Sequence, residues 1–575
     1  MKIVSLEIEK FRGIRECNID FPVDSRVIFL IGAGDTTKST LLTAIQWILW
    51  PTWNLIATDT DFYNKDIRNP IVLKGTFSEI PEELISEEKF GLYLRKPGVK
   101  YDFISDDEPN DKDPICITVQ LTIDSNLEPK WEVVCNRKEP ISISNNDRKK
   151  LSVSVIGDNC ARDLLWGKNS VLQKYADSRG ILHEAYVEAI RDAAKKADLS
   201  ALDSITDKVV DVAKNYGIAF EGEISNKLIY QNGSYTTDVG IFDGDIPLTQ
   251  KGKGSQRLLS IGLNIGKTNE GTILLVDEIE TGLEPYRLKS LINILRGNRL
   301  VSGQVLATTH SPIAVSEAIL DELMFITHQD GVTRAAQLSA KDLDRKFFQG
   351  EIRKNAESFL TKRLIVCEGK TEIGFVRALD SYLQETQNLR MAFYGVGPFL
   401  GGGENVLTNA EMLKNIGYDV VIFMDSDKES EESKKQEAKE KGLEIIDWEK
   451  PYAIEQQIFK ESTVDVANQL LRIAVEEKSI DSVTSKLTDI SYEIDEFGNI
   501  KLDNSTTTEQ LVSIGGIAMQ KKCSWYKRTD LGEAVGNTVF RNFDSFPSEG
   551  RVKTVVKQIE AWVKKYERAG DPDNS

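Results

Sequence analysis

Short apolar runs alternate with charged or glycine-containing segments over residues 1–80. The N-terminal stretch MKIVSLEIEKFRG alternates apolar and charged positions, which is typical of a half-buried strand. The apolar run RVIFLI leads into the nonapeptide GAGDTTKST at 32–40, and a segment with helical spacing follows it. This pattern predicts a strand, a second strand, a loop, a helix and then further strands.

The pattern changes several times between residues 80 and 360. Extended runs such as ICITVQLTI (115–123) and ISISNN (141–146) give way to helical periodicity at 160–215. Strand signals return near 217–243, and a glycine-rich loop, a helix and the apolar run TILLVDE (272–278) follow. A strand, a Thr-Thr-His turn and another strand occupy 304–328. The chain becomes polar near 340–360, where we place a domain boundary.

A second alternation of strands and helices begins at residue 361. It reads LIVCEG, a helix, MAFYGVG, a helix and VVIFMDSD, and the remaining C-terminal part has mainly helical spacing. Strands that alternate with helices predict an α/β fold with a parallel sheet. We therefore expect two domains, at 1–350 and 355–575.

Composition narrows the chemistry but not the partner. The chain has 575 residues, of which 40% are hydrophobic, and no apolar run reaches the ~18–20 residues of a membrane span. Six cysteines without metal-site spacing favour free thiols in the cytoplasm. With only three histidines, carboxylates holding Mg²⁺ or Mn²⁺ are the expected metal site. The net charge of −18 disfavours nucleic acid at first, but acidic runs such as 428–442, interpreted as a solvated helix face, leave that open.

The nonapeptide matches a phosphate-binding loop with one departure. Such loops read G-x-x-x-x-G-K-[ST], and Thr37 stands where the second glycine belongs. The other glycines permit turns that aim N–H groups at phosphate, the lysine would reach the β- and γ-phosphates, and the serine would bind Mg²⁺. The cofactor-binding residues predicted here are Gly32, Gly34, Lys38, Ser39 and Thr40.

Thr37 leaves the activity of this loop open. A β-branched residue disfavours positive φ and crowds the phosphates. If the usual torsions are kept, we expect weaker binding or slow hydrolysis, whereas a negative φ would leave binding intact.

Further motifs support a nucleotide site. In TILLVDEIETGLEP (272–285), Asp277 would hold the Mg²⁺ water shell and Glu278 would polarise the attacking water. LATTHSP (306–312) places His310 where it could sense a γ-phosphate. LTQKGKGSQRLLSIGL (248–263) opens an apolar helix with a glycine-rich loop whose N–H groups could face an anion. Each alone also fits an ordinary strand end or loop. The residues singled out in the last motif are Gly252, Gly254, Ser255 and Gln256.

The order of these motifs resembles the ATP-binding-cassette ATPases of the RecF/SMC type. The opening EIEKFRGIRECNIDFP is similar to the start of those chains. The resemblance implies a dimer in which Gly254, Ser255 and Gln256 of one subunit contact ATP held by the loop of another. It also makes the helices at about 160–215 a dimerisation insertion, with a partner-binding arm as the alternative.

Acidic residues recur at the predicted strand ends of the second domain. LIVCEGKTEIGFVRAL (364–379) carries Glu368 at a strand tip and Glu372 one helical turn later. VVIFMDSDKE carries Asp425 and Asp427 at the end of a strand, where residues i and i+2 share a face. Carboxylates gathered at one sheet edge repel one another unless cations bind, and two divalent metals suit phosphodiester displacement. Two ordinary βα turns with acidic caps are the alternative.

This pattern resembles the Toprim domain of topoisomerases, primases and certain nucleases. By that resemblance, Glu368, Asp425 and Asp427 match the core metal-binding acids, and Glu372 matches an extra acid of nuclease branches. Glu429 is a weaker candidate. Glu455 in DWEKPYAIEQQIF is either an additional metal acid or a plain helix residue. Lys527 matches a phosphate-stabilising lysine of those nucleases. The alternative for Lys527, with Trp525 and Tyr526 before it, is a basic helix start with an aromatic core contact.

A RecF-like ATPase joined to a Toprim domain resembles the OLD (overcoming lysogenization defect) nuclease family. The implied fold is α/β: an ABC-type P-loop ATPase domain with a helical insertion, then a Toprim domain with C-terminal helices. The resemblance implies a DNA endonuclease or nickase that requires Mg²⁺ or Mn²⁺. It also implies an ATPase module that binds ATP with Mg²⁺ and assembles as a homodimer or a larger homo-oligomer. The implied biological role is anti-phage defence. A reverse transcriptase with its RNA–DNA product (a retron) is an associated partner in some members.

Two other functions compete with this one. An ATP-binding DNA scaffold or sensor with little turnover would also explain Thr37. A topoisomerase would need a nucleophilic tyrosine in a DNA-gate domain, and no segment has the length or basic character to supply one.

Overall fold

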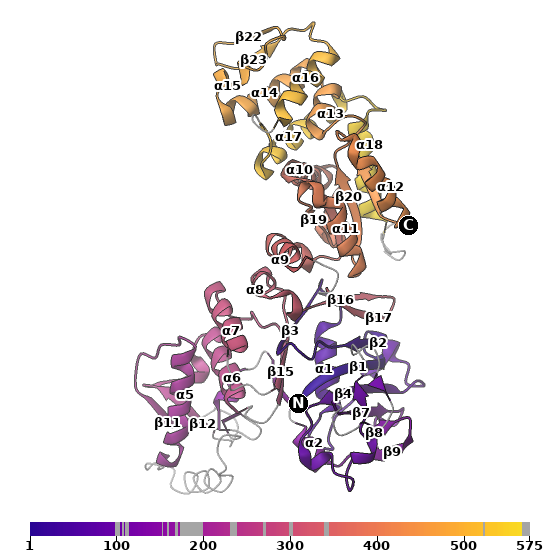
Figure 1. Ribbon diagram of the computed structural model, residues 1–575. Helices are drawn as coiled ribbons and strands as arrows, with labels where there is room; N and C mark the ends of the chain where they lie inside the picture. The colour runs from indigo at the N-terminus through magenta and orange to yellow at the C-terminus, as the bar shows by residue number, and fades with distance from the viewer. Residues whose placement is uncertain are drawn as a thin grey trace. The chain divides into compact units, whose positions relative to one another are not determined.

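The computed structural model describes residues 1–97, 104–105, 109, 114–151, 153–157, 160–166, 171–172, 199–229, 238–267, 272–297, 303–338, 344–520 and 524–565. The chain divides into two compact units, Met1–Ala356 and Glu357–Ser575. Each unit is considered by itself below (Figure 1).

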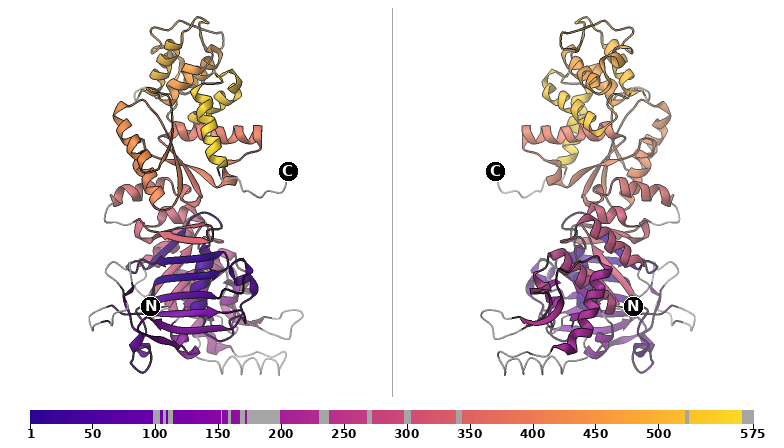
Figure 2. Two further views of the ribbon diagram at one scale, coloured as in Figure 1. Left: turned by 90° about the vertical axis from the view of Figure 1, so that its right-hand side faces the viewer. Right: turned by 90° about the vertical axis from the view of Figure 1, so that its left-hand side faces the viewer.

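A large sheet organises the first unit. Its order is β10-β14-β15-β3-β16-β17-β2-β1-β4-β7-β8-β9. The strands from β10 to β16 run parallel, whereas those from β2 to β9 pair antiparallel and lie side by side in Figure 2. The strands are β1 (Lys2–Phe11), β2 (Ile14–Asp20), β3 (Val27–Ile31), β4 (Ile71–Ser78), β7 (Cys116–Ile123), β8 (Pro129–Cys135), β9 (Lys138–Ser142), β10 (Val153–Ile156), β14 (Thr272–Val276), β15 (Gly303–Thr308), β16 (Leu323–Gln329) and β17 (Val332–Ala336).

The parallel strands carry the nucleotide motifs at their carboxyl ends. VIFLI in β3 and TILLV in β14 are buried throughout, because helices cover both faces of a parallel sheet. Helix α1 follows β3 and shares its core with β3 and β4. The helices of this unit are α1 (Lys38–Ile48), α2 (Asn145–Lys150), α5 (Asp203–Asn215), α6 (Lys253–Lys267), α7 (Pro285–Gly297), α8 (Pro312–Glu317) and α9 (Arg345–Lys354).

Smaller elements complete the first unit. Strands β11 (Ile224–Ile229), β12 (Asp238–Asp243) and β13 (Ile246–Pro247) form one sheet, and β5 (Lys96–Pro97) pairs with β6 (Ile104–Ser105). Helix α5 packs closely on α6: a Cβ added at Gly262 would lie 2.4 Å from a methyl of Val212. Most of the helical insertion expected at 160–215 lies outside the described residues.

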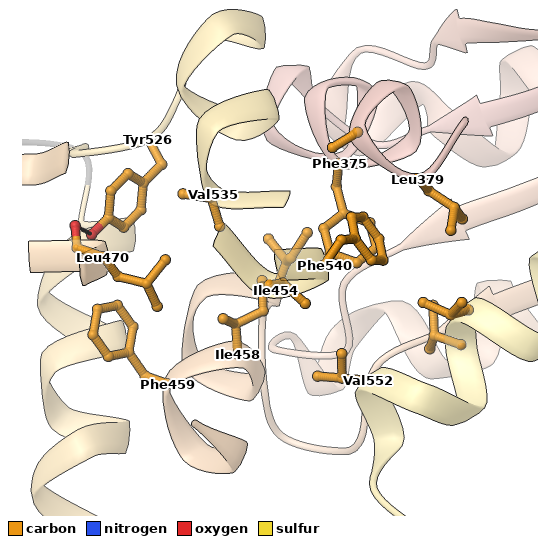
Figure 3. Close-up of a cluster of buried hydrophobic side chains, with 14 of the residues drawn as sticks. Phe375, Leu379, Ile454, Ile458, Phe459, Leu470, Tyr526, Val535, Phe540 and Val552 are labelled. Atoms are coloured by element: carbon orange, nitrogen blue, oxygen red, sulfur yellow. Dashed lines mark hydrogen bonds between the residues drawn. The ribbon is translucent and has the colours of Figure 1, made fainter. Parts of the chain in front are cut away.

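A four-stranded parallel sheet organises the second unit, in the order β19 (Val396–Leu400), β18 (Arg363–Cys367), β20 (Asp419–Met424), β21 (Glu444–Asp447). One sheet face contributes Ile365 and Phe423 to a large apolar core with Phe375 and Phe540, shown in part in Figure 3. The other elements are α10 (Lys370–Gln387), α11 (Val406–Asn415), α12 (Glu432–Glu440), α13 (Ile454–Glu461), α14 (Val464–Lys478), α15 (Ile480–Thr484), β22 (Tyr492–Ile494), β23 (Ile500–Leu502), α16 (Thr508–Met519), α17 (Thr529–Arg541) and α18 (Arg551–Lys564).

The strand order of this sheet has a switch point between β18 and β20. The chain leaves β18 towards β19 on one side, and it leaves the adjacent β20 towards β21 on the other. Loops that depart in opposite directions from neighbouring parallel strands open a crevice at the carboxyl ends, where ligands of α/β sheets bind. Glu368 follows β18 and Asp425 follows β20, so both lie at this switch point.

Several boundaries differ from the sequence-based expectations. The expectation that Asp425 and Asp427 lie on a strand is wrong, because β20 ends at Met424 and both belong to the following loop. Helix α6 begins at Lys253, so the glycine-serine motif forms its first turn instead of a preceding loop. MAFYGVG contains a short 3-10 helix, Met391–Tyr394, before β19. The expectation of extended structure through 141–146 fails at Asn145, where α2 begins.

No helix in the described parts of the chain is long and apolar enough to cross a membrane.

Candidate nucleotide site and carboxylate cluster

The phosphate loop after β3 closes around its own lysine. Lys38, the first residue of α1, donates from Nζ to the carbonyl oxygens of Gly32 (3.0 Å) and Ala33 (2.6 Å) and to Thr36 Oγ1 (3.1 Å). Burial lowers the pKa of Lys38 to about 8. Its ammonium is thus held inside the loop, where it can exchange carbonyl partners for phosphate oxygens.

Thr37 adopts the left-handed conformation that its glycine counterpart would supply. Its φ and ψ are 63° and 14°, so the first of the two alternatives for this residue holds. The methyl group lies towards Gly13, and the hydroxyl contacts the carbonyl oxygen of Thr36 (2.6 Å) and Thr333 Oγ1 (2.8 Å). The side chain is therefore occupied by contacts within the protein.

Two hydroxyl groups from different elements donate to the same carboxylate oxygen beside the phosphate loop. Ser39 Oγ and Thr308 Oγ1 donate to Asp277 Oδ1 over 2.9 Å and 2.6 Å. Ser39 is the second residue of α1, Asp277 follows β14, and Thr308 ends β15. Thr40 is the next residue of α1. A hydroxyl and a carboxylate at such a junction are the donors that Mg²⁺ takes beside bound phosphates.

Glu278 and His310 lie at neighbouring strand ends, and a residue that the motifs did not identify organises them. Glu278 is exposed with φ 48°, and its N–H donates to Thr308 Oγ1. His310 is also exposed. The carboxylate of Glu280 accepts from Thr309 Oγ1 and from the His310 N–H, both at 2.6 Å. Glu280 thus fixes the turn that presents the histidine.

The glycine-serine motif at the start of α6 packs against its own subunit. A Cβ at Gly254 would lie 2.3 Å from the Gly282 carbonyl oxygen, so only glycine fits. Ser255 Oγ accepts from the Arg287 guanidinium at 3.3 Å. The Gln256 amide donates to the carbonyl oxygens of Thr249 and Lys251 at 2.8 and 2.7 Å, while Gly252 is exposed.

Arg257, the next residue, joins this motif to the end of β14. It is 2% exposed and donates to the backbone carbonyls of Asp277 and Glu278. This contact could not be predicted from the sequence, because a basic residue in a helix does not reveal its partner.

The carboxylates of the second unit connect its loops through backbone N–H groups. Glu368 Oε2 accepts from the Asp425 N–H (3.0 Å), and Asp425 Oδ1 accepts from the Ile454 N–H (2.8 Å) at the start of α13. Glu372 Oε2 accepts from the Gly369 N–H (2.8 Å). The loop after β18, the loop after β20 and α13 therefore meet at the crevice.

These carboxyl groups influence one another strongly. Burial raises the pKa of Glu372 to about 8, with further increases from Glu455 and Glu368. Burial, followed by the charges of Glu372, Glu368 and Glu455, raises the pKa of Asp425 well above its usual value. The pKa of Glu455 is raised by burial and, to a lesser extent, by Asp427. The predicted acids are thus gathered in one electrostatically coupled cluster.

Two exposed lysines act on acids of this cluster. Lys428 Nζ lies 3.7 Å from Glu368 Oε1, and the charge of the exposed Lys527 lowers the pKa of Glu455. Glu429 is exposed. Burial raises the pKa of Glu368, and the charges of Glu431 and Asp427 raise it further.

The aromatic residues before Lys527 have a structural role. Trp525 and Tyr526 are each 1% exposed, and Tyr526 donates from its hydroxyl to the Leu470 carbonyl oxygen (2.8 Å; Figure 3). The core-contact alternative for these two residues is therefore correct.

The donor set fits a hard divalent cation in kind. It consists of carboxylate oxygens that are partly or fully buried and repel one another, which is the condition that a bound cation relieves. In the parts of the chain that the structure describes, no three acidic, histidine or cysteine side chains are already arranged to hold an ion. Binding would therefore draw these side chains closer together.

A buried lysine, which sequence composition did not distinguish from its neighbours, holds the loop that carries Asp425 and Asp427. Lys435 of α12 is 2% exposed and donates to the Asp425 carbonyl oxygen (2.7 Å), Ser426 Oγ (2.9 Å) and Asp447 Oδ2 (3.0 Å). Interpreting the whole of 428–442 as a solvated face is wrong at this residue, because one lysine in a charged run cannot be distinguished by composition.

Solved structures that resemble the chain include an SMC head bound to the C-terminal winged-helix domain of ScpA, with 14% identity, 59% of this chain and 98% of that chain covered and a TM-score of 0.37. An SMC head domain from Thermotoga maritima has 13% sequence identity and a TM-score of 0.30, and the match covers 59% of this chain and 100% of that chain. The third structure is an Smc head with an extended coiled coil, bound to the C-terminal domain of ScpA from Pyrococcus furiosus. It has 15% sequence identity and a TM-score of 0.37, and the match covers 61% of this chain and 99% of that chain.

No curated protein matches the chain. A sequence-family profile described as "AAA domain, putative AbiEii toxin, Type IV TA system" matches residues 27–316, just over half of the chain. The match runs from β3 through α8, so it includes the phosphate loop, the Asp277 strand end and the His310 turn. The chain belongs to this AAA family, and its first unit contains a P-loop ATPase domain of the kind that uses ATP with Mg²⁺.

Proposed function

We propose that the protein is a divalent-metal-dependent DNA endonuclease or nickase of the OLD type, in which the ATPase domain positions or gates a Toprim nuclease site. The observation that carries the proposal is the cluster at the switch point of the second sheet. Glu368 and Asp425 follow the ends of adjacent strands. Burial raises the pKa of Asp425 well above its usual value, and the charges of Glu372, Glu368 and Glu455 raise it further. Such a concentration of negative charge favours cations and the phosphate groups that accompany them.

Within this site the chain's own residues would divide the work. Glu368, Glu372, Asp425, Asp427 and Glu455 would hold Mg²⁺ or Mn²⁺, which supplies charge for both oxygens of an in-line phosphodiester displacement. Lys527 is exposed at the edge of the cluster and would stabilise charge on the scissile phosphate.

The nucleotide site would act in a dimer. Lys38 would bind the β- and γ-phosphates, Asp277 and Ser39 would hold Mg²⁺, and Glu278 would polarise the attacking water. Gly254, Ser255 and Gln256 would contact the ATP of the second copy. Arg257 links that motif to the backbone of Asp277 and Glu278, which supports communication between the two ATP sites.

The biological setting is proposed on wider grounds. The family description names a toxin of a toxin–antitoxin system, which is compatible with an anti-phage role in the cytoplasm. A reverse transcriptase and its RNA–DNA product as partner stays a prediction from the family resemblance alone.

A second candidate function is an ATP-binding DNA scaffold or sensor without cleavage. One observation favours it: the described residues contain no group of three ligands already arranged for a metal.

Cleavage assays separate these functions. Purified full-length protein is incubated with supercoiled, linear and single-stranded DNA in Mg²⁺ or Mn²⁺, with and without ATP, and with EDTA as control. The nuclease proposal expects nicked or linear products that EDTA abolishes. Binding of ATP and DNA without any product would support the scaffold and contradict the nuclease.

A further inference from the structure

The threonine in the phosphate loop has a partner that no motif predicts. Thr37 is held at φ 63°, a region in which β-branched residues are disfavoured. Its hydroxyl lies 2.8 Å from Thr333 Oγ1 on β17, and Thr333 is 1% exposed. His328 on β16 pairs across the hairpin with Thr333, and its Nδ1 lies 2.9 Å from the same hydroxyl.

The directions of these hydrogen bonds follow from counting protons. Each hydroxyl carries one proton. Thr37 can only donate to the Thr36 carbonyl oxygen, at 2.6 Å. Its oxygen therefore accepts from the Thr333 hydroxyl, and the Thr333 oxygen accepts from His328 Nδ1–H. The network is a directed chain that runs from β16 through β17 into the phosphate loop.

The same hairpin supports the loop at a second point. Gly32 has φ 147°, and a Cβ there would lie 2.4 Å from the Ile326 carbonyl oxygen of β16. The first and the sixth residue of the loop thus both rest on the hairpin formed by β16 and β17. Thr36, between them, accepts from Lys38 Nζ and donates to the Ala33 carbonyl oxygen (2.9 Å).

We propose that Thr333 is a positioning residue for ATP binding, which acts through Thr37 and compensates for the glycine that the loop lacks. A loop with glycine at 37 reaches the left-handed conformation without help. With threonine, the Thr333 hydroxyl holds the side chain away from the phosphates and keeps the N–H groups of the loop aimed at the nucleotide. The inference rests on ATP binding at this loop.

A double-mutant cycle tests this proposal in the full-length protein. ATP affinity is measured by calorimetry for the wild type, Thr333→Val, Thr37→Gly and the double variant, with Thr333→Ser as the variant that retains the hydroxyl. We expect Thr333→Val to weaken ATP binding about 3- to 10-fold, the worth of a neutral hydrogen bond. Thr333→Ser should stay within about 2-fold of the wild type, since its hydroxyl remains.

The Thr37→Gly background makes the result specific. There, Thr333→Val should change ATP affinity by less than about 2-fold, because the residue on which Thr333 acts is absent. An equal loss in both backgrounds, or no loss in either, would overturn the proposal.

The melting temperatures of the same four proteins without nucleotide form an independent cycle. A Thr333→Val decrease that disappears in the Thr37→Gly background supports the contact, and one that persists contradicts it. A wild type that binds no ATP would refute the nucleotide function, while this second cycle would still decide the Thr37–Thr333 contact.

Discussion

Glu372 shows at the scale of one residue what the carboxylate cluster costs the metal-free protein. Its carboxyl group is buried in α10, and the negative charges of Glu455 and Glu368 act on it. Its folded pKa of about 8 exceeds the ordinary 4.5. Between these values the folded protein retains a proton that the unfolded chain releases, so the free energy of unfolding falls as pH rises through this window.

Because the free energy of unfolding falls as pH rises, thermal stability should depend on both pH and bound metal. In EDTA, we expect the melting temperature of the second unit to fall as pH rises from about 5 to about 8. Mg²⁺ or Mn²⁺ should raise it more at the higher pH, where the carboxylates are ionised and repel one another. Glu372→Gln should flatten the pH dependence. Differential scanning calorimetry measures all three, and an equal metal effect at both pH values would contradict the cluster as a metal site.

At the scale of elements, the crossing of α13 and α16 places Glu455. A Cβ at Gly515 would lie 2.6 Å from Gln456 Cα and 2.8 Å from the Glu455 carbonyl oxygen, whereas at Gly516 the nearest atom is the flexible Gln456 amide at 3.4 Å. Adjacent glycines of one helix therefore meet very different surroundings.

These glycines form a matched pair of variants. Gly515→Ala should destabilise the protein by about 1–3 kcal/mol and reduce DNA cleavage, because overpacking displaces the helix that carries Glu455. Gly516→Ala should be neutral or stabilise by up to about 1 kcal/mol, because alanine favours a helix. Urea unfolding measures both, and equal destabilisation by the two would show that the crossing is looser than described.

Elements were predictable where one physical signal dominated. The runs VIFLI, ILLV and LIVC are apolar throughout because parallel strands are covered on both faces, and they form β3 and most of β14 and β18. Strand ends were less certain: VVIFMDSD gives no local reason for β20 to stop at Met424. The loop is held there by Lys435 of α12, a tertiary contact.

The residues of the candidate sites also differ in whether a local pattern predicts them. Lys38, Asp277 and Glu368 could be found because glycine-rich turns and acids at strand ends follow local rules. Arg257 and Thr333 could not, since their importance comes from partners about 20 and 296 residues away in the chain. The conformation of Thr37 was likewise fixed by β17 and not by its own propensity.

At the scale of the whole molecule, the proposed ATP sites require a second copy. We expect Glu278→Gln to slow ATP hydrolysis by about 100-fold while leaving ATP binding intact, because the group that polarises water is lost. This variant should form dimers when ATP is added, as measured by light scattering after gel filtration. Adding Ser255→Arg, which crowds the motif expected to contact the other subunit's ATP, should abolish the ATP-dependent increase in mass. An unchanged mass with and without ATP in Glu278→Gln would contradict assembly through the nucleotide.

The proposed nuclease function depends on the carboxylates at the switch point of the second sheet. Asp425→Asn removes the charge but keeps an oxygen that can accept from the Ile454 N–H, so it tests chemistry more than folding. Asp465→Asn, at an exposed position in α14, is the matched control.

Cleavage of supercoiled plasmid in Mg²⁺ or Mn²⁺ by the wild type and these two variants is the most direct measurement. We expect Asp425→Asn to lower the cleavage rate by about 100-fold or more, since metal ions supply several kcal/mol of transition-state stabilisation. ATP binding should be retained, and Asp465→Asn should cut like the wild type. Cleavage by Asp425→Asn at the wild-type rate would contradict the assignment of these carboxylates as the nuclease site.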